Sequence, residues 1–128
     1  PPHYEIPRIA VLESGDELSR NANPAMLEPG QIPASNGAMI EAMLTDYVGK
    51  VIQIGPVPDR LGALEEALHE AEDCHILITS GGASVGDHDL IQQALKDWGA
   101  EIAFWKVAIK PGKPLMVATR EARCGRQV

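Results

Sequence analysis

The chain has 128 residues and a mass of 13.7 kDa, which suits one compact domain and is too short for two full-sized domains. Hydrophobic residues make up 45% and charged residues 23%, a balance that excludes disordered, collagen-like and coiled-coil proteins. Aromatic residues reach only 4%, so we expect a mainly aliphatic core.

The formal net charge of −7 argues against nucleic acid or an anionic membrane as a partner. The charge is uneven along the chain. Residues 1–73 carry 4 basic and 13 acidic side chains, whereas residues 74–128 carry 7 basic and 5 acidic ones. The second half can therefore still attract a small anionic ligand.

The two cysteines, Cys74 and Cys124, are too few for a disulfide framework and lack metal-ligand spacing. No stretch approaches the roughly 20 apolar residues that span a bilayer, and the N-terminus shows no signal-peptide pattern. These features predict a cytoplasmic protein with no membrane partner.

Apolar runs alternate with helical stripes, which predicts an α/β domain with a mostly parallel sheet. We expect strands over 8–12, 51–54, 76–79, 102–109 and 115–118. Segment 19–34 holds three prolines, which predicts an irregular loop with a functional role. Residues 110–113 (Lys-Pro-Gly-Lys) suit a type II turn, so the last two strands should form an antiparallel hairpin at one end of the sheet.

Three helices are expected between these strands, each with an apolar face. The first is capped by Ser35 or Asn36, ends at Gly49 and should pack one stripe on the sheet: Met39, Ile40, Met43, Leu44, Tyr47 and Val48. The second follows Asp59 and buries Leu61, Leu64, Leu68 and Ala71, and the third buries Leu90, Ile91, Ala94, Leu95 and Trp98.

Acidic residues follow three of the predicted strands. In open α/β sheets, ligands bind beyond the carboxyl ends of the strands. Glu17, Asp59 and Asp89 come from three separate loops there and can converge on one cleft. Such carboxylates suit a Mg²⁺ ion that bridges to substrate phosphates. Taken singly, each acid is better explained as a helix cap or a surface charge.

A glycine turn follows the strand at 76–79. It contains Ser80, Gly81, Gly82, Ser84 and Asp87. Its glycines let a ligand approach the backbone closely, and the following helix directs N–H groups at one point. The expected ligand is therefore phosphate or a similar oxyanion. The alternative is a tight strand-to-helix turn with Asp87 as its N-cap.

Three lysines surround the last predicted turn. Lys106 and Lys110 lie four residues apart on an extended strand and so share a face, and Lys113 follows across the turn. Their mutual repulsion favours an anionic partner. The alternative is an edge hairpin whose lysines prevent aggregation.

Five segments now stand in a fixed order: 14–18 (Ser-Gly-Asp-Glu-Leu), 29–37 (Pro-Gly-Gln-Ile…Ser-Asn-Gly), 57–59 (Val-Pro-Asp), 79–89 (Thr-Ser-Gly-Gly-Ala-Ser-Val-Gly-Asp-His-Asp) and 106–114 (Lys-Val-Ala-Ile-Lys-Pro-Gly-Lys-Pro). As an ordered set, they resemble the molybdopterin molybdenumtransferase family of molybdenum cofactor biosynthesis, which includes the gephyrin E-domain. The resemblance implies a three-layer MogA-like (Rossmann-like) α/β domain, here 1–128, as a fragment of a larger homodimeric protein.

The resemblance also implies an activity. Family members bind adenylylated molybdopterin and molybdate, release AMP and insert molybdenum with Mg²⁺. Glu17, Asp59 and Asp89 match the family's functional acids, and Lys106 and Lys110 match its functional lysines. The glycine turn with Ser84 would hold the pterin or its phosphate.

The chain departs from the family pattern at several positions. Glu13-Ser14 replaces Ser-Thr, Ala83 replaces Val, His88 replaces Tyr, and Arg60 stands where a second Asp often follows Asp59. The chain stops at Val128, before a Gly-Leu-Pro-Gly-Asn-Pro segment that the family carries. Two rival functions stay open: a MogA-type molybdopterin adenylyltransferase, and a molybdopterin-binding module without turnover.

Overall fold

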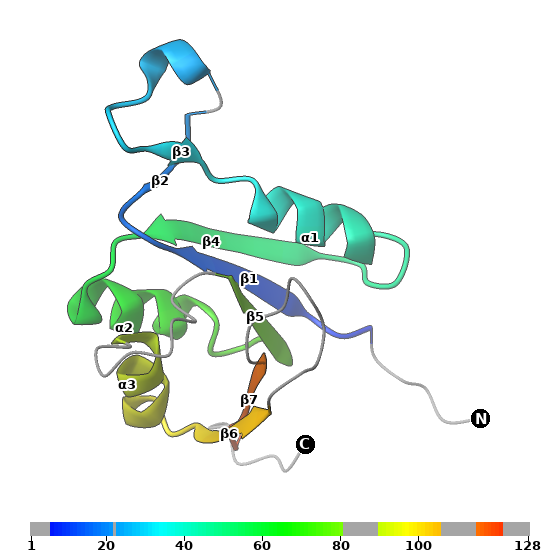
Figure 1. The fold of residues 1–128 in the computed structure, drawn as a ribbon. Coiled ribbons are helices and arrows are strands. Elements are labelled where there is room, and N and C mark those ends of the chain that lie inside the picture. Colours follow the sequence, from blue (N-terminus) through cyan, green and yellow to red (C-terminus); the bar gives the residue numbers. More distant parts are fainter. Residues whose placement is uncertain (1–5, 22, 81–89, 106–114, 122–128) are drawn as a thin grey trace.

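The computed structural model describes residues 6–21, 23–80, 90–105 and 115–121 (Figure 1). Its centre is a three-stranded parallel sheet in the order β4-β1-β5. The strands are β1 (Ile9–Ser14), β4 (Val51–Val57) and β5 (Ile76–Ser80). The predicted parallel sheet is therefore confirmed, with β1 in the middle.

Strand β1 is buried along its whole length. Ala10 and Leu12 belong to the main apolar cluster with residues of α2 and α3, whereas Ile9 and Val11 are buried outside that cluster. Side chains alternate across a strand, so both faces of β1 are covered. As expected, the core is aliphatic.

Helices lie on both faces of the sheet, which confirms the three-layer α/β fold (Figure 1). Helix α1 (Asn36–Leu44) packs against β1 and β4, and α2 (Leu61–Glu70) packs against β4 and against α3 (Leu90–Asp97). The predicted apolar faces of α2 and α3 are confirmed, since the buried residues there are Leu64, Ala67, Leu68, Ile91, Ala94 and Leu95.

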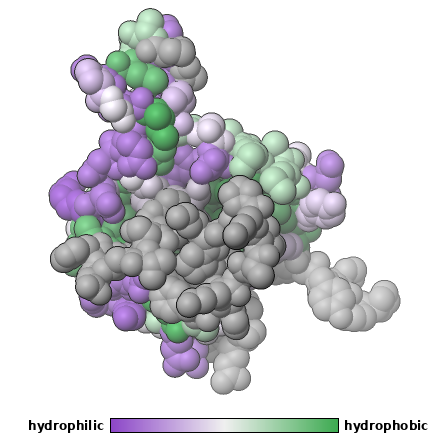
Figure 2. All heavy atoms as spheres, viewed as in Figure 1, coloured by the Kyte–Doolittle hydropathy of each residue, from purple (hydrophilic) through white to green (hydrophobic). Residues whose placement is uncertain are grey.

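The prediction for α1 is partly wrong. The helix ends at Leu44 rather than Gly49, because the N–H groups of Tyr47 and Val48 both donate to the Leu44 carbonyl in a tight turn. Met39, Met43 and Tyr47 are 56%, 67% and 79% exposed. Apolar residues gather over α1 in Figure 2. Two neighbouring ridges of this helix are apolar, and a narrow sheet with β4 at its edge covers only one of them.

Segment 19–34 is more ordered than its prolines predict. Strand β2 (Leu18–Ser19) pairs in parallel with β3 (Ile32–Pro33), and a short helix, η1 (Pro24–Met26), lies between them. The Ile32 N–H donates to the Glu17 carbonyl over 2.7 Å. This unit projects away from the main sheet and fixes the chain directly after Glu17 (Figure 1).

Strand β4 runs three residues further than predicted, through the cis Gly55–Pro56 peptide to Val57. Its register with β1 shifts between Leu12 and Ser14. A proline is tolerated there because β4 is an edge strand and the pairing is locally irregular.

The last two described strands, β6 (Glu101–Trp105) and β7 (Leu115–Thr119), pair antiparallel as predicted. Within the described residues they form a separate two-stranded sheet. The predicted turn at 110–113 lies outside the described residues. Of the helices that the structure describes, none has the length and apolar character needed to cross a bilayer.

Candidate functional site

The structure describes three of the predicted site residues: Glu17, Asp59 and Ser80. All three follow or end strands of the parallel sheet at its carboxyl edge. The other predicted residues lie outside the described ranges: Gly81, Gly82, Ser84, Asp87, Asp89, Lys106, Lys110 and Lys113. Their roles stay predictions.

A hydrogen bond joins the loops after β1 and β4. The backbone N–H of Asp59 donates to Oδ1 of Asp16 over 2.9 Å, and the N–H of Gly15 donates to the Val57 carbonyl over 3.1 Å. These contacts hold Asp59 beside the turn that carries Glu17. The sequence places Asp16 near the site but does not show that it braces the neighbouring loop.

The turn after β1 needs a glycine. Gly15 has a φ of +148°, and a Cβ there would lie 2.7 Å from Oε1 of Glu17. The Glu17 carboxylate therefore folds back over the backbone of Gly15. Both Glu17 and Asp59 are exposed, so their carboxylates are open to a ligand at this edge.

Oxygen donors of this kind fit a Mg²⁺ ion, which needs only one or two carboxylates when phosphate oxygens complete its shell. Over 6–21, 23–80, 90–105 and 115–121, no group of three or more Asp, Glu, His or Cys side chains is placed to hold a metal. Asp89 lies outside these ranges, so the three-acid site stays a prediction.

A polar network that runs from buried Glu13 to exposed Gln53 lies behind this edge, between β1, β4 and α1. Glu13 is only 5% exposed, and its Oε1 accepts the N–H of Gly37. Gln53 donates from Nε2 to the Gly37 carbonyl over 2.8 Å and to Oε1 of Glu41 over 3.4 Å. Both peptide groups of Gly37 are thus held by side chains from the sheet.

This network caps α1. Ser35 occupies the N-cap position but makes no side-chain cap hydrogen bond, which corrects the prediction that Ser35 or Asn36 caps the helix. The carboxylate of Glu13 satisfies an N–H of the first turn instead, and a negative charge is favourable at a helix N-terminus. Burial raises the pKa of the Glu13 carboxyl above its ordinary value.

A side chain at Gly37 would displace the ends of the Glu13 and Gln53 side chains. An added Cβ would lie 2.8 Å from Oε1 of Glu13 and closer still to Oε1 of Gln53. Glu13 directly follows the apolar run Ile9–Leu12 in the same strand, and this position is the sequence signal for a buried carboxylate.

Asn36 connects the start of α1 to the end of β5. Its Nδ2 donates to Oγ of Ser80 over 2.9 Å. Ser80 also pairs directly with Glu13 in the parallel ladder. The network therefore reaches a residue predicted to bind the ligand.

A hollow of about 330 Å³ adjoins the end of β4. Arg20 and Arg60 line it together with Glu66 and Glu70. The hollow therefore has mixed charge, with two guanidinium groups and two carboxylates in its lining.

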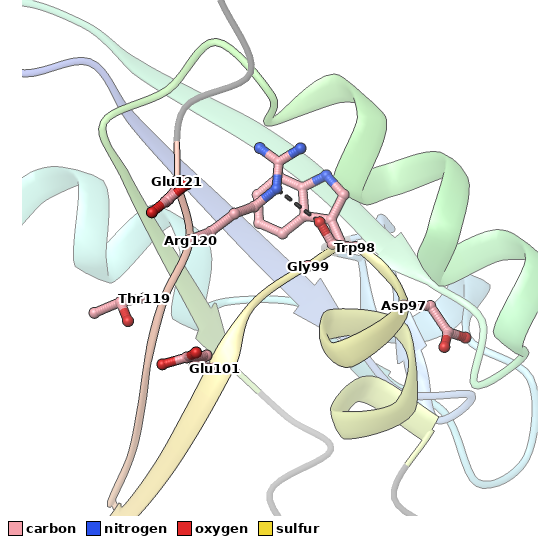
Figure 3. Close-up of a pocket in the computed structure, with 7 residues that line it drawn as sticks. All are labelled: Asp97, Trp98, Gly99, Glu101, Thr119, Arg120 and Glu121. Carbon is pink, nitrogen blue, oxygen red and sulfur yellow. Dashed lines mark hydrogen bonds between the residues drawn. The ribbon is translucent and has the colours of Figure 1, made fainter. Parts of the chain in front are cut away.

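A larger cavity, about 660 Å³, lies at the other end of the sheet, lined by Asp97, Trp98, Gly99, Glu101, Thr119, Arg120 and Glu121 (Figure 3). Arg120 stacks on the Trp98 ring at 4.0 Å, donates from Nε to the Trp98 carbonyl over 2.7 Å and lies 3.6 Å from Glu72. Glu72 lies in the turn between α2 and the start of β5, so this cavity is at the amino edge of the parallel strands. Although this cavity is larger than the hollow at the carboxyl edge, Arg120 is already occupied by Glu72 and the Trp98 carbonyl. Arg120 is therefore poorly placed to bind an anionic ligand.

Cys74 lies near the same amino edge. Burial raises the pKa of its thiol, and Asp73 adds to that effect while Arg8 opposes it. The side chain packs against the apolar cluster. A partly buried thiol with a raised pKa is less reactive than an exposed one.

The chain matches the model of a family described as a probable molybdopterin binding domain over residues 10–127. The chain belongs to this family. It is 42% identical over 117 residues to a molybdopterin molybdenumtransferase of Nostoc sp. and 38% identical over 112 residues to that of Haemophilus influenzae. These matches cover 91% and 87% of the chain.

The chain spans only 26% and 27% of the length of these two relatives. It is also 34% identical to the molybdenum cofactor synthesis protein cinnamon of Drosophila melanogaster, covering 90% of the chain and 19% of that protein. Among solved structures, the molybdopterin biosynthesis MoeA protein of Pyrococcus horikosii superposes with a TM-score of 0.73 at 28% identity, over 91% of this chain and 28% of that one.

Proposed function

We propose that this chain binds molybdopterin at the carboxyl edge of its parallel sheet, within a protein that inserts molybdenum into the cofactor. The main structural support for this site is the Asp59–Asp16 hydrogen bond, because it brings the acidic loops after β1 and β4 together. The family match supplies the ligand class. Molybdate is the second substrate in this proposal, and AMP leaves when the substrate is adenylylated molybdopterin.

Glu17 and Asp59 would hold a Mg²⁺ ion, with Asp89 as a third ligand. The ion would offset the negative charge of phosphate oxygens when bound. The Asp16 side chain holds Asp59 by accepting its backbone N–H. The Asp59 carboxylate is therefore left exposed and available for an ion or an ordered water.

Basic groups would complete the site. Arg20 and Arg60 line the hollow beside β4 and can pair with a phosphate. Lys106 and Lys110 would stabilise charge on the transferring oxyanion, with Lys113 nearby. Gly81, Gly82, Ser84 and Asp87 would form the turn that holds the pterin or its phosphate.

Two rivals follow from the same ligand. A molybdopterin adenylyltransferase would form an adenylate from molybdopterin and Mg-ATP, whereas a binding module would bind without chemistry. The names of the relatives support the transferase. We also propose that the longer protein forms a homodimer. Adenylate formation on incubation with Mg-ATP would favour the first rival.

The proposal is tested by calorimetric titration of the chain with molybdopterin in Mg²⁺, for the wild type and Asp59→Asn. Asp59→Asn keeps the backbone N–H that Asp16 accepts but removes a charge, so we expect binding to weaken about tenfold or more, as for loss of a charged contact. Asp46→Asn, an equal charge change in the exposed turn after α1, is the control and should bind like the wild type. No binding by the wild type would refute the proposal.

A further inference from the structure

The hydrogen bond between Asn36 and Ser80 has a direction. The Asn36 amide nitrogen is the donor, so the Ser80 oxygen is an acceptor in this contact. A hydroxyl group has one proton, and an amide nitrogen cannot accept it. The Ser80 proton is therefore left to donate to a different group.

Among the residues that the structure describes, the Ser80 hydroxyl accepts this bond and donates none. Ser80 ends β5 at the carboxyl edge, where ligands bind in open α/β sheets. An oxyanion offers only acceptors and so complements a hydroxyl whose proton is free.

Hydrogen bonds to the neighbouring residue, Gly37, fix the position of Asn36. Glu13 accepts the Gly37 N–H, and Gln53 donates to the Gly37 carbonyl. Glu13 pairs with Ser80 in the strand register, so the residue that anchors the start of α1 also adjoins the residue that Asn36 contacts. A rotation of the first turn of α1 would break both contacts at once.

We propose that Asn36 is a positioning residue that orients the Ser80 hydroxyl as a hydrogen-bond donor to an anionic oxygen of the ligand, with Glu13 and Gln53 holding Asn36 in register. This inference rests on the proposed function and assigns Asn36, Glu13 and Gln53 a role in it. The recognised group is an oxyanion. Phosphate on the pterin and molybdate are its two sources.

Asn36→Asp separates positioning from folding. The aspartate has the same shape but cannot donate to Ser80, so the Ser80 proton turns toward Asp in place of the ligand. A carboxylate in the first turn is favourable to the helix, so the melting temperature should be unchanged or higher. We expect molybdopterin binding to weaken about tenfold while stability is retained.

The matched control is Asn23→Asp. It makes the same chemical change in the unit that projects from the sheet, and its Oδ1 can still accept the Ala25 N–H. We expect wild-type affinity for molybdopterin. Titration with inorganic phosphate and with molybdate, each alone, shows which oxyanion loses affinity in Asn36→Asp.

A double-mutant cycle decides whether Asn36 acts through Ser80. Ser80→Ala should weaken molybdopterin binding about tenfold. Adding Asn36→Ala to Ser80→Ala should then weaken it no further, although Asn36→Ala alone weakens it about threefold. Wild-type affinity in Asn36→Ala and Asn36→Asp, or losses that simply multiply in the double variant, would overturn the inference. Failure of the wild type to bind molybdopterin would instead remove the proposed function itself.

Discussion

Oδ1 of Asp16 accepts the backbone N–H of Asp59 over 2.9 Å, so an acid after β1 braces the loop after β4. Asp16→Ala removes this acceptor and should lower the free energy of unfolding by about 1 kcal/mol, with weaker Mg²⁺-dependent binding of molybdopterin. Asp16→Asn retains a carbonyl oxygen and should lose less of both. Urea unfolding and calorimetry measure the two effects, and equal losses in Ala and Asn would show that the acceptor oxygen is not the cause.

Gly37 and Gly62 offer a matched pair of glycines inside helices. A Cβ at Gly37 would overlap Glu13 and Gln53, so Gly37→Ala should destabilise the protein by about 1–3 kcal/mol. A Cβ at Gly62 meets nothing within 4 Å, so Gly62→Ala should stabilise it by up to about 1 kcal/mol. Opposite signs in urea unfolding are the expected result. A stabilising Gly37→Ala would contradict the packing around Glu13.

Glu13 should give folding a specific pH dependence. Burial raises its pKa in the folded state above the ordinary glutamate value of about 4.3, so the folded protein binds this proton more tightly than the unfolded chain. The contribution of Glu13 to stability is thus fully present below about pH 4.3 and is lost as pH rises through the folded pKa.

Glu13→Gln keeps an oxygen for the Gly37 N–H and removes the titration. Relative to the wild type, this variant should therefore gain stability as pH rises from 4 toward 7. Unfolding free energies measured at intervals across this range test the expectation. A difference between the two proteins that stays constant with pH would show that burial of the Glu13 charge does not affect folding.

Arg120, directly after β7, contacts residues that follow α2 and α3. It stacks on Trp98, bonds the Trp98 carbonyl through Nε and faces Glu72, with its side chain 11% exposed. Arg120→Lys keeps the charge but loses the planar group and the Nε donor, so stability should fall by about 1–2 kcal/mol. Arg60→Lys, an exposed position, is the control and should change stability by less than about 0.5 kcal/mol. Equal melting temperatures for both variants would refute this role.

The sequence could predict the parts of the fold in which one pattern has one explanation. The run at Ile9–Leu12 is apolar at every position, as expected for a strand buried on both faces. The stripes of α2 and α3 occupy a single face each, so their buried sides were predictable. Helix α1 has two apolar ridges, and periodicity alone cannot say which one meets the sheet.

The site was predictable only as a set of positions. Strand ends locate Glu17, Asp59 and Ser80 at one edge, because parallel strands end together. The contacts behind them depend on side chains far apart in the sequence: Glu13 meets Gly37 across 24 residues, and Asn36 meets Ser80 across 44. The path of the chain between the parallel strands brings these residues together, and no local sequence pattern encodes that path.

In the proposed function, molybdopterin binds at the carboxyl edge of the parallel sheet. Backbone amide chemical shifts of the isotope-labelled chain, recorded during a titration with molybdopterin in Mg²⁺, test it most directly. We expect the largest changes at Asp16, Glu17, Asp59 and Ser80. Changes confined to the cavity at the amino edge, around Trp98, Glu101 and Glu121, would contradict it.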